Sequence, residues 1–138
     1  MPSTTKLLKW REHPVAKIPN GYQVAVADVN GDGKPDILAL SSEKSVVEWY
    51  ENPGWKARPI TTQTKNNISL APLTWKGYAG HGLALATDFH LEDSSRGGNL
   101  WWASPGNSPD SEWRPTSIGT VPTSHRLRWA DFDGDGRP

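Results

Sequence analysis

The hydrophobic residues of this chain fall in short runs that are closed by turn-forming residues. Residues 22–27 read YQVAVA and residues 36–41 read DILALS, with a stretch rich in glycine and aspartate between them. Apolar runs of this length predict β-strands, and a turn between two of them predicts a hairpin. The pattern predicts strands over about 22–28, 37–42, 46–51 and 56–61. It therefore predicts an all-β, antiparallel fold.

The predicted turn after the first strand has the composition of a calcium-binding loop. It reads DVNGDGKPD over residues 28–36, so that oxygen-bearing side chains recur at alternate positions. Calcium needs several oxygen ligands at about 2.3–2.6 Å, and alternate positions let a short loop wrap around the ion. The predicted ligands are four side chains and, as a fifth ligand, one backbone carbonyl: Asp28, Asn30, Asp32, Asp36 and the carbonyl of Lys34.

The same stretch recurs near the end of the chain as DFDGDGRP over residues 131–138. Its predicted ligands are Asp131, Asp133, Asp135 and the carbonyl of Arg137. Two copies with one spacing favour structural Ca²⁺ over the alternative, which is a pair of acidic turns without an ion.

Two further markers repeat in the same order as the acidic loop. A tryptophan followed five residues later by valine or isoleucine occurs at Trp10, Trp55 and Trp113. An aromatic pair followed by a turn occurs at 49–54 and again at 101–106. Several markers in one order indicate that a single supersecondary unit is repeated.

The acidic loop and its flanking strands resemble the FG-GAP/VCBS repeat. The core of that repeat, A-D-x-[ND]-G-D-G-[KR]-P-D, matches residues 27–36 and, incompletely, residues 130–138. The resemblance implies a β-propeller, whose blades are four-stranded antiparallel sheets. Propellers close with about four to eight blades. We therefore expect this chain to form about two and a half blades and to need further chain for closure.

The repeat divides the chain into four expected parts. Residues 1–21 form the outer strand of a preceding or closing blade, and residues 22–61 form a blade with a calcium loop. Residues 62–118 form a blade with a long hairpin and a degenerate loop, in which 75–81 has lost the carboxylates and binds no calcium. Residues 119–138 begin the next blade and carry the truncated calcium loop.

Composition narrows the classes of partner. Lys and Arg number 15, as do Asp and Glu, so the net charge does not favour nucleic acid. No run of about 18 apolar residues predicts a membrane span, and residues 1–19 lack the apolar core of a secretion signal. The repeat family nevertheless favours a location outside the cytoplasm.

Candidate catalytic residues lie on the loops expected at the rim opposite the calcium loops. His125, which is followed by Arg126, begins a predicted inner strand, and the long loop of the neighbouring blade brings Asp88 and His90. Histidine titrates near neutral pH, so His125 is a candidate general base. Asp88 and His90 could position a proton or hold a second divalent metal, Zn²⁺ or Mg²⁺. The alternative is a structural histidine beside a solvated acidic hairpin.

Residues 83–132 are also similar to the propeller of the aldos-2-ulose dehydratases. The similarity lies in the following residues: 86–88, Gly98, 101–106 with 52–54, Trp113, 117–119 and 125–128. That family eliminates water from 2-keto sugars such as 1,5-anhydro-D-fructose, so the resemblance implies a carbon–oxygen lyase in which His125 transfers a proton. Its enzymes also carry a second propeller and a cupin domain, which this sequence lacks.

The competing interpretation is a lectin-like or adhesion propeller that binds sugar or protein without catalysis. A lectin would repeat its binding residues in each blade, whereas an enzyme would have one unrepeated cluster. His125 has no histidine counterpart at Tyr22 or near Asn67, which favours the enzyme.

Overall fold

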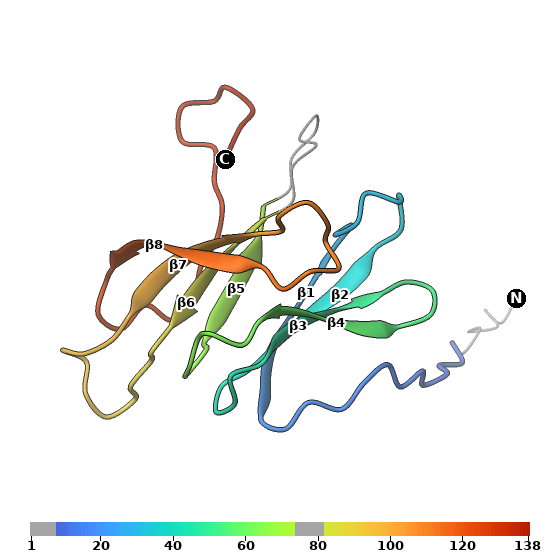
Figure 1. The fold of residues 1–138 in the computed structure, drawn as a ribbon, viewed down its shortest axis with the longest axis horizontal. Coiled ribbons are helices and arrows are strands. Elements are labelled where there is room, and N and C mark those ends of the chain that lie inside the picture. The colour runs from blue at the N-terminus through green and yellow to red at the C-terminus, as the bar shows by residue number, and fades with distance from the viewer. Residues whose placement is uncertain (1–7, 74–81) are drawn as a thin grey trace, which may run out of the picture.

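The computed structural model describes residues 8–73 and 82–138 and shows two four-stranded antiparallel sheets (Figure 1). The first sheet is formed by β1 (Gly21–Ala27), β2 (Asp36–Ser41), β3 (Val47–Glu51) and β4 (Lys56–Thr61). The second is formed by β5 (Ser69–Pro72), β6 (Leu83–Thr87), β7 (Asn99–Ser104) and β8 (Arg114–Thr120). The prediction of an all-β, antiparallel fold is confirmed, and the strands of the first sheet lie within one residue of their predicted bounds.

In both sheets each strand pairs with the strand that follows it in the sequence. Ala27 pairs with Asp36 at the end of the first hairpin, and Leu38 pairs with Trp49 on the next strand. The second sheet repeats this order through pairs such as Leu85 with Trp101. Short apolar strands joined by turns satisfy their backbone groups most directly with their sequence neighbours.

The two sheets share one hydrophobic core. Its buried members come from both sheets and from the loops next to them: Val29, Leu38, Leu40, Val47, Trp49, Ile60, Leu70, Leu83, Leu85, Ala103 and Trp113. Full burial of a side chain such as Leu or Val stabilises the fold by about 1.5–3 kcal/mol. Burial of this core therefore stabilises each sheet and also the packing of one sheet against the other.

Polar contacts add to the core at the junction between the sheets. The Gln23 side chain on β1 accepts from the backbone N–H of Leu70 at 3.0 Å and donates to its carbonyl at 2.9 Å. On the outer side, the backbone N–H of Trp113 donates to the Ile60 carbonyl at 2.6 Å. These contacts fix β1 beside β5 and the β7–β8 loop beside β4 (Figure 1).

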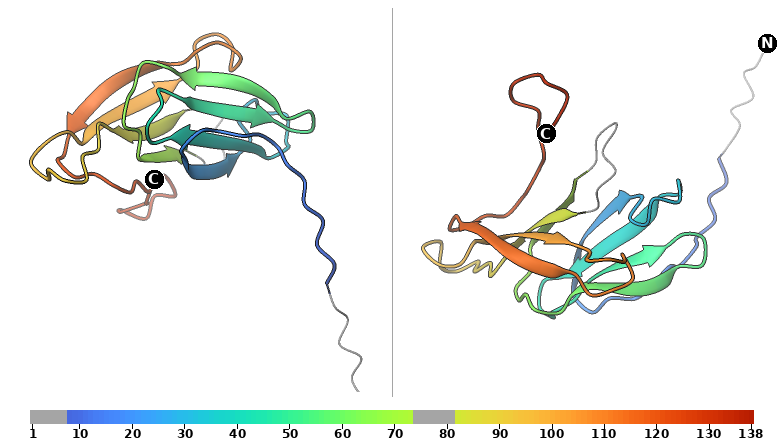
Figure 2. Two further views of the ribbon diagram at one scale, coloured as in Figure 1. Left: turned by 90° about the horizontal axis from the view of Figure 1, so that it is seen from below. Right: turned by 45° about the horizontal axis from the view of Figure 1, so that its top comes forward.

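The sheets stand side by side and do not close into a ring (Figure 2). The arrangement is that of a partial β-propeller, with β1 and β5 adjacent. Among the residues that the structure describes, no helix is long and apolar enough to cross a membrane.

Three sequence expectations differ from the structure or lie outside it. The described part of the predicted outer strand, residues 8–20, forms no strand, because no neighbouring strand lies beside it to complete a ladder. Residues 121–138 also form no strand, although residues 119 and 120 complete β8. The degenerate loop, residues 75–81, lies outside the described residues.

Candidate functional site

The first acidic loop is folded around the carboxylate of Asp28. One oxygen of that carboxylate accepts from the N–H groups of Gly31 and Asp32, at 2.8 and 3.1 Å. The other oxygen accepts from the N–H of Gly33 at 2.8 Å. Gly31 and Gly33 have positive φ angles of 76° and 82°, which glycine adopts without strain. The tight winding of the loop therefore follows from its glycines and from hydrogen bonds within the loop itself.

The second acidic loop has the same internal hydrogen bonds. Asp131 accepts from the N–H of Gly134 at 2.7 Å and from the N–H of Gly136 at 2.8 Å. Those glycines have φ angles of 79° and 86°. The next contact is also shared, because Arg137 donates its N–H to Asp135 at 2.8 Å as Lys34 does to Asp32 at 2.9 Å. Two distant segments have therefore reached one loop conformation.

The second loop gathers oxygen ligands. Carboxylate oxygens of Asp131, Asp133 and Asp135 lie within 4.8 Å of one another, and all three residues are exposed. Carboxylates in a flexible, exposed loop are the donors that Ca²⁺ prefers. The donor set of the loop therefore fits the ion that the sequence predicts.

Backbone N–H donors lower the pKa of one aspartate in each acidic loop. The N–H of Gly136 is the main cause that holds the pKa of Asp131 below its ordinary value. In the first loop, the N–H of Lys34, with its ammonium group 3.1 Å from the carboxylate, lowers the pKa of Asp32. Both carboxylates are therefore in the charged form that a cation requires at neutral pH.

Asp36 differs from the other predicted ligands because it is completely buried. One of its oxygens accepts from the N–H of Val29 at 2.9 Å, and the other accepts from the N–H of Asn52 at 2.8 Å. Asp36 therefore joins the first acidic loop to the β3–β4 turn. Among the described residues, the carboxylates that lie close enough to form a metal-ligand group are those of the second loop, and Asp36 is not one of them.

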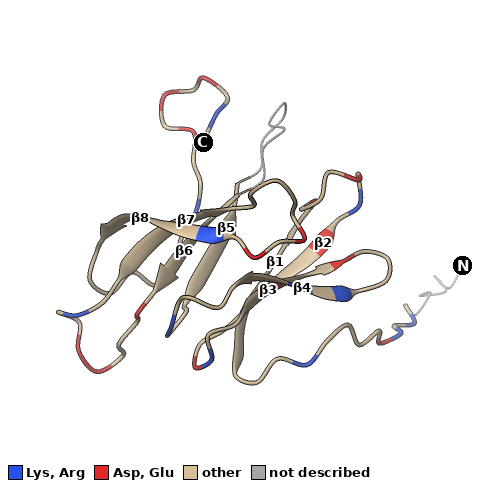
Figure 3. Cartoon of the chain, viewed as in Figure 1, with Lys and Arg blue, Asp and Glu red and all other residues tan. Residues whose placement is uncertain are grey.

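The two acidic loops project on one side of the molecule, and the β2–β3 and β6–β7 loops project on the opposite side (Figure 1). Figure 3 shows in red the acidic residues of both acidic loops, which lie on the first of these two sides. The candidate catalytic residues belong to the other side, where the backbone N–H of Val121 donates to the Gly98 carbonyl at 2.9 Å.

His125 lies in a cluster drawn from three parts of the chain. Its Nε2 atom is 2.8 Å from the hydroxyl of Tyr22 on β1 and 3.2 Å from Nη1 of Arg126. The imidazole also packs on the ring of Phe89 from the β6–β7 loop, with ring centroids 5.0 Å apart. A guanidinium group can only donate, so Nε2 of His125 is the acceptor in its contact with Arg126.

Asp88 and His90 form a separate pair on the β6–β7 loop. Nε2 of His90 is 2.9 Å from one carboxylate oxygen of Asp88, and Asn99 donates to the other at 3.4 Å. Within the described part of the chain, no third histidine or carboxylate joins them as a metal-ligand group. The second divalent metal remains a prediction without a complete ligand set.

Sequence reasoning did not select Tyr22 or Phe89 as site residues. Both contact His125 only through the tertiary fold, since Tyr22 is 103 positions away. Their positions in the predicted repeat were the available signal. Tyr22 lies at the start of a strand and Phe89 follows a strand, both on the rim where we expect His125.

A cleft of about 390 Å³ extends between β1, β5 and the segment that follows His125. Trp129 lines it, and its indole N–H donates to the Ala71 carbonyl at 2.9 Å. Gln23 and Arg128 add polar groups to an otherwise apolar wall. An exposed indole beside polar side chains is the kind of surface on which a sugar ring can stack.

The fold and the acidic loop together define a propeller-type repeat. Comparison with protein families supports this class, because residues 20–42 match the FG-GAP repeat. The match covers β1, the first acidic loop and β2. No curated protein matches the chain.

Proposed function

We propose that this chain is a calcium-binding section of an FG-GAP/VCBS-type β-propeller. The observation that carries the proposal is the shared conformation of the two acidic loops, with the same aspartate–glycine hydrogen bonds in each. A loop that only reverses the chain does not need oxygen-bearing side chains at three alternate positions, whereas a Ca²⁺ site requires several converging oxygen ligands.

The proposed ligands are those predicted from the sequence. In the first loop they are Asp28, Asn30, Asp32, Asp36 and the Lys34 carbonyl, and in the second they are Asp131, Asp133, Asp135 and the Arg137 carbonyl. Bound calcium would neutralise the carboxylates of both loops and, in the first loop, would cross-link β1 and β2. The chain itself supplies the preformed turn and, through Asp36, its attachment to the sheet.

Thermal unfolding with and without calcium tests this proposal. A ligand that binds only the native state stabilises it by about 2.7 kcal/mol at a concentration 100-fold above its dissociation constant. We expect calcium to raise the Tm of the wild type and to raise it less in Asp28→Asn and in Asp135→Asn. Glu92→Gln, an exposed change outside both loops, is the matched control. An equal Tm with chelator and with calcium would refute calcium binding.

A second function is favoured by the unrepeated cluster at His125. We propose that the protein acts on a carbohydrate, as a dehydratase of 2-keto sugars such as 1,5-anhydro-D-fructose. In this role Nε2 of His125 would remove the proton next to the carbonyl, and Arg126 would stabilise the enolate. The enolate would then collapse to a carbon–carbon double bond as the β-hydroxyl leaves, taking that proton back from His125 to depart as water. Trp129 would support the sugar ring. A lectin-like or adhesion propeller remains the alternative, since the cleft could bind sugar without chemistry.

The dehydratase proposal is tested on the full-length protein with 1,5-anhydro-D-fructose. Water elimination would be followed by the absorbance of the unsaturated product. We expect turnover in the wild type, a loss of about 10²–10⁴-fold in kcat for His125→Ala, and little change for His13→Ala. Sugar binding without turnover in the wild type would favour the lectin instead.

A further inference from the structure

Arg126 is held in a fixed position but has no acidic partner among the residues that the structure describes. Its Nη2 atom donates to the Tyr22 hydroxyl at 3.3 Å, and its Nη1 atom donates to the His125 carbonyl at 2.8 Å. The guanidinium carbon lies 5.3 Å from the centroid of the Tyr22 ring. Among the described residues no carboxylate forms an ion pair with Arg126, whereas Arg58 pairs with Glu51 and Asp110.

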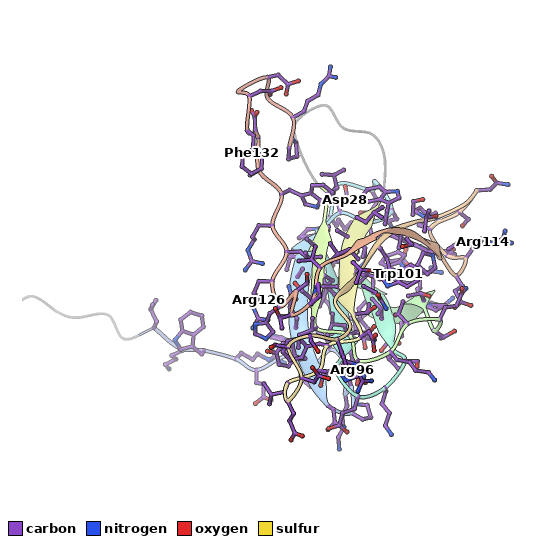
Figure 4. All side chains as sticks on the ribbon, turned by 90° about the vertical axis from the view of Figure 1, so that its left-hand side faces the viewer. Asp28, Arg96, Trp101, Arg114, Arg126 and Phe132 are labelled. Carbon is purple, nitrogen blue, oxygen red and sulfur yellow. The ribbon has the colours of Figure 1, made fainter. Side chains whose placement is uncertain are left out.

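The side chains around Arg126 do not neutralise it. Tyr22, His125 and Phe89 form its immediate cluster, and none of them is acidic. Asp88 adjoins Phe89 in the sequence, but its carboxylate is engaged by His90 and Asn99. Figure 4 shows Arg126 on the chain segment that leads toward Phe132, at the outside of the sheets. The site thus presents a positive charge to whatever binds beside it.

The chemistry of this cluster favours an anionic ligand over a neutral one. Arginine has five N–H donors in a planar fork that fits both oxygens of a carboxylate. Two of its nitrogens are held by Tyr22 and His125, so the fork is oriented before a ligand arrives. Among the described residues no carboxylate pairs with this guanidinium. An anionic ligand would therefore form a charge-assisted hydrogen bond here that the hydroxyl group of a neutral sugar cannot form.

We propose that Tyr22, His125 and Arg126 recognise a carboxylate-bearing sugar, of the hexuronate class, whose carboxylate binds Arg126. The sugar ring lies toward the cleft that Trp129 lines. This inference rests on the carbohydrate function proposed above and changes its substrate class from a neutral to an acidic sugar.

Binding of three probes to the calcium-loaded full chain tests the inference. D-Glucuronate carries both the ring and the carboxylate, D-glucose carries the ring alone, and acetate carries the carboxylate alone. We expect glucuronate to bind at least tenfold more tightly than either of the others. A hydrogen-bonded ion pair contributes about 1.5–3 kcal/mol, so Arg126→Gln should weaken glucuronate binding about 10- to 100-fold.

Two variants control for changes in charge and fold. Arg114→Gln removes an exposed arginine on β8, outside both the cluster and the cleft, and it should leave glucuronate binding within about twofold of the wild type. Arg126→Lys keeps the charge but not the planar fork, so its affinity should fall between wild type and Arg126→Gln.

The other outcomes separate this inference from the function beneath it. Equal binding of glucose and glucuronate, unaffected by Arg126→Gln, would overturn the acidic-sugar inference and leave a carbohydrate site. Acetate binding as tightly as glucuronate, or no binding of any probe, would overturn the carbohydrate function together with the inference.

Discussion

Asp36 has a clear role in the fold and is also one of the proposed calcium ligands. The repeat pattern predicts it as the last ligand of the first acidic loop, and the structure finds it fully buried with two backbone N–H donors. Burial of a carboxylate is costly unless hydrogen bonds compensate for the lost water. The two donors provide that compensation and make Asp36 the anchor of the loop.

Replacement of Asp36 should destabilise the protein even without calcium. Asp36→Ala leaves the N–H groups of Val29 and Asn52 without their acceptors, and each such loss costs about 1–3 kcal/mol. We expect the free energy of unfolding to fall by about 2–5 kcal/mol in calcium-free urea denaturation. Glu92→Ala, which is exposed, should change it by less than about 0.5 kcal/mol. Equal effects of the two changes would exclude the anchoring role.

The exposed aspartates of the loops should make the calcium-free protein sensitive to acid. The folded pKa values of Asp32 and Asp131 are lowered by backbone N–H donors, so their stabilising effect is complete above the unfolded value of about 3.9. It is lost as the pH falls through the lower, folded pKa. We expect the urea midpoint to hold from pH 7 to 5 and to decline below about pH 4.

Asp131→Asn provides the internal comparison for the acid prediction. Asparagine does not titrate, so the decline of the urea midpoint below pH 4 should be smaller in this variant than in the wild type. A midpoint that is constant between pH 4 and 2 would contradict the prediction.

At the scale of elements, the β6–β7 loop is shaped by two consecutive glycines. Gly97 and Gly98 have φ angles of 67° and 75°. A Cβ atom on Gly98 would lie 1.9 Å from the Val121 carbonyl oxygen, which is part of the segment leading to His125. The close approach of these two backbones places Phe89 against His125. The glycines therefore position the candidate site from outside it.

Gly98→Ala should separate the β6–β7 loop from the segment before His125. A positive φ and a backbone clash each cost about 1–3 kcal/mol, so the expected loss of stability is about 2–5 kcal/mol. Gly106→Ala is the matched control, because its Cβ would meet nothing within 4 Å. Urea denaturation of both variants measures the difference. A loss no larger for Gly98→Ala than for Gly106→Ala would show that the backbones can separate without cost.

At the scale of the whole molecule, the first sheet leaves apolar residues on its outer face. Val24 and Val26 on β1 are 70% and 64% exposed. They line part of a groove of about 530 Å³ with Ile37 and Tyr50. Exposed apolar patches on a sheet promote association.

We therefore expect the chain to self-associate, and the double change Val24→Thr with Val26→Thr to reduce that association. Threonine keeps the β-branched shape but exposes less apolar surface. Sedimentation velocity over a range of concentrations measures the effect. Leu91→Thr alters an exposed apolar side chain outside β1, and it should leave the distribution unchanged. Identical behaviour of both variants would exclude the β1 surface as the cause.

Local pattern determined much of this protein. The short apolar runs, the spacing of tryptophans and the Asp–Gly loops predict the strands, their antiparallel order and the acidic turns, because hairpin pairing and glycine φ angles depend on residues close in sequence. The anchoring of Asp36 and the approach of Tyr22 and Phe89 to His125 depend on packing between segments. These contacts join residues that are far apart in the sequence, so a local sequence pattern does not predict them and only the tertiary structure decided them.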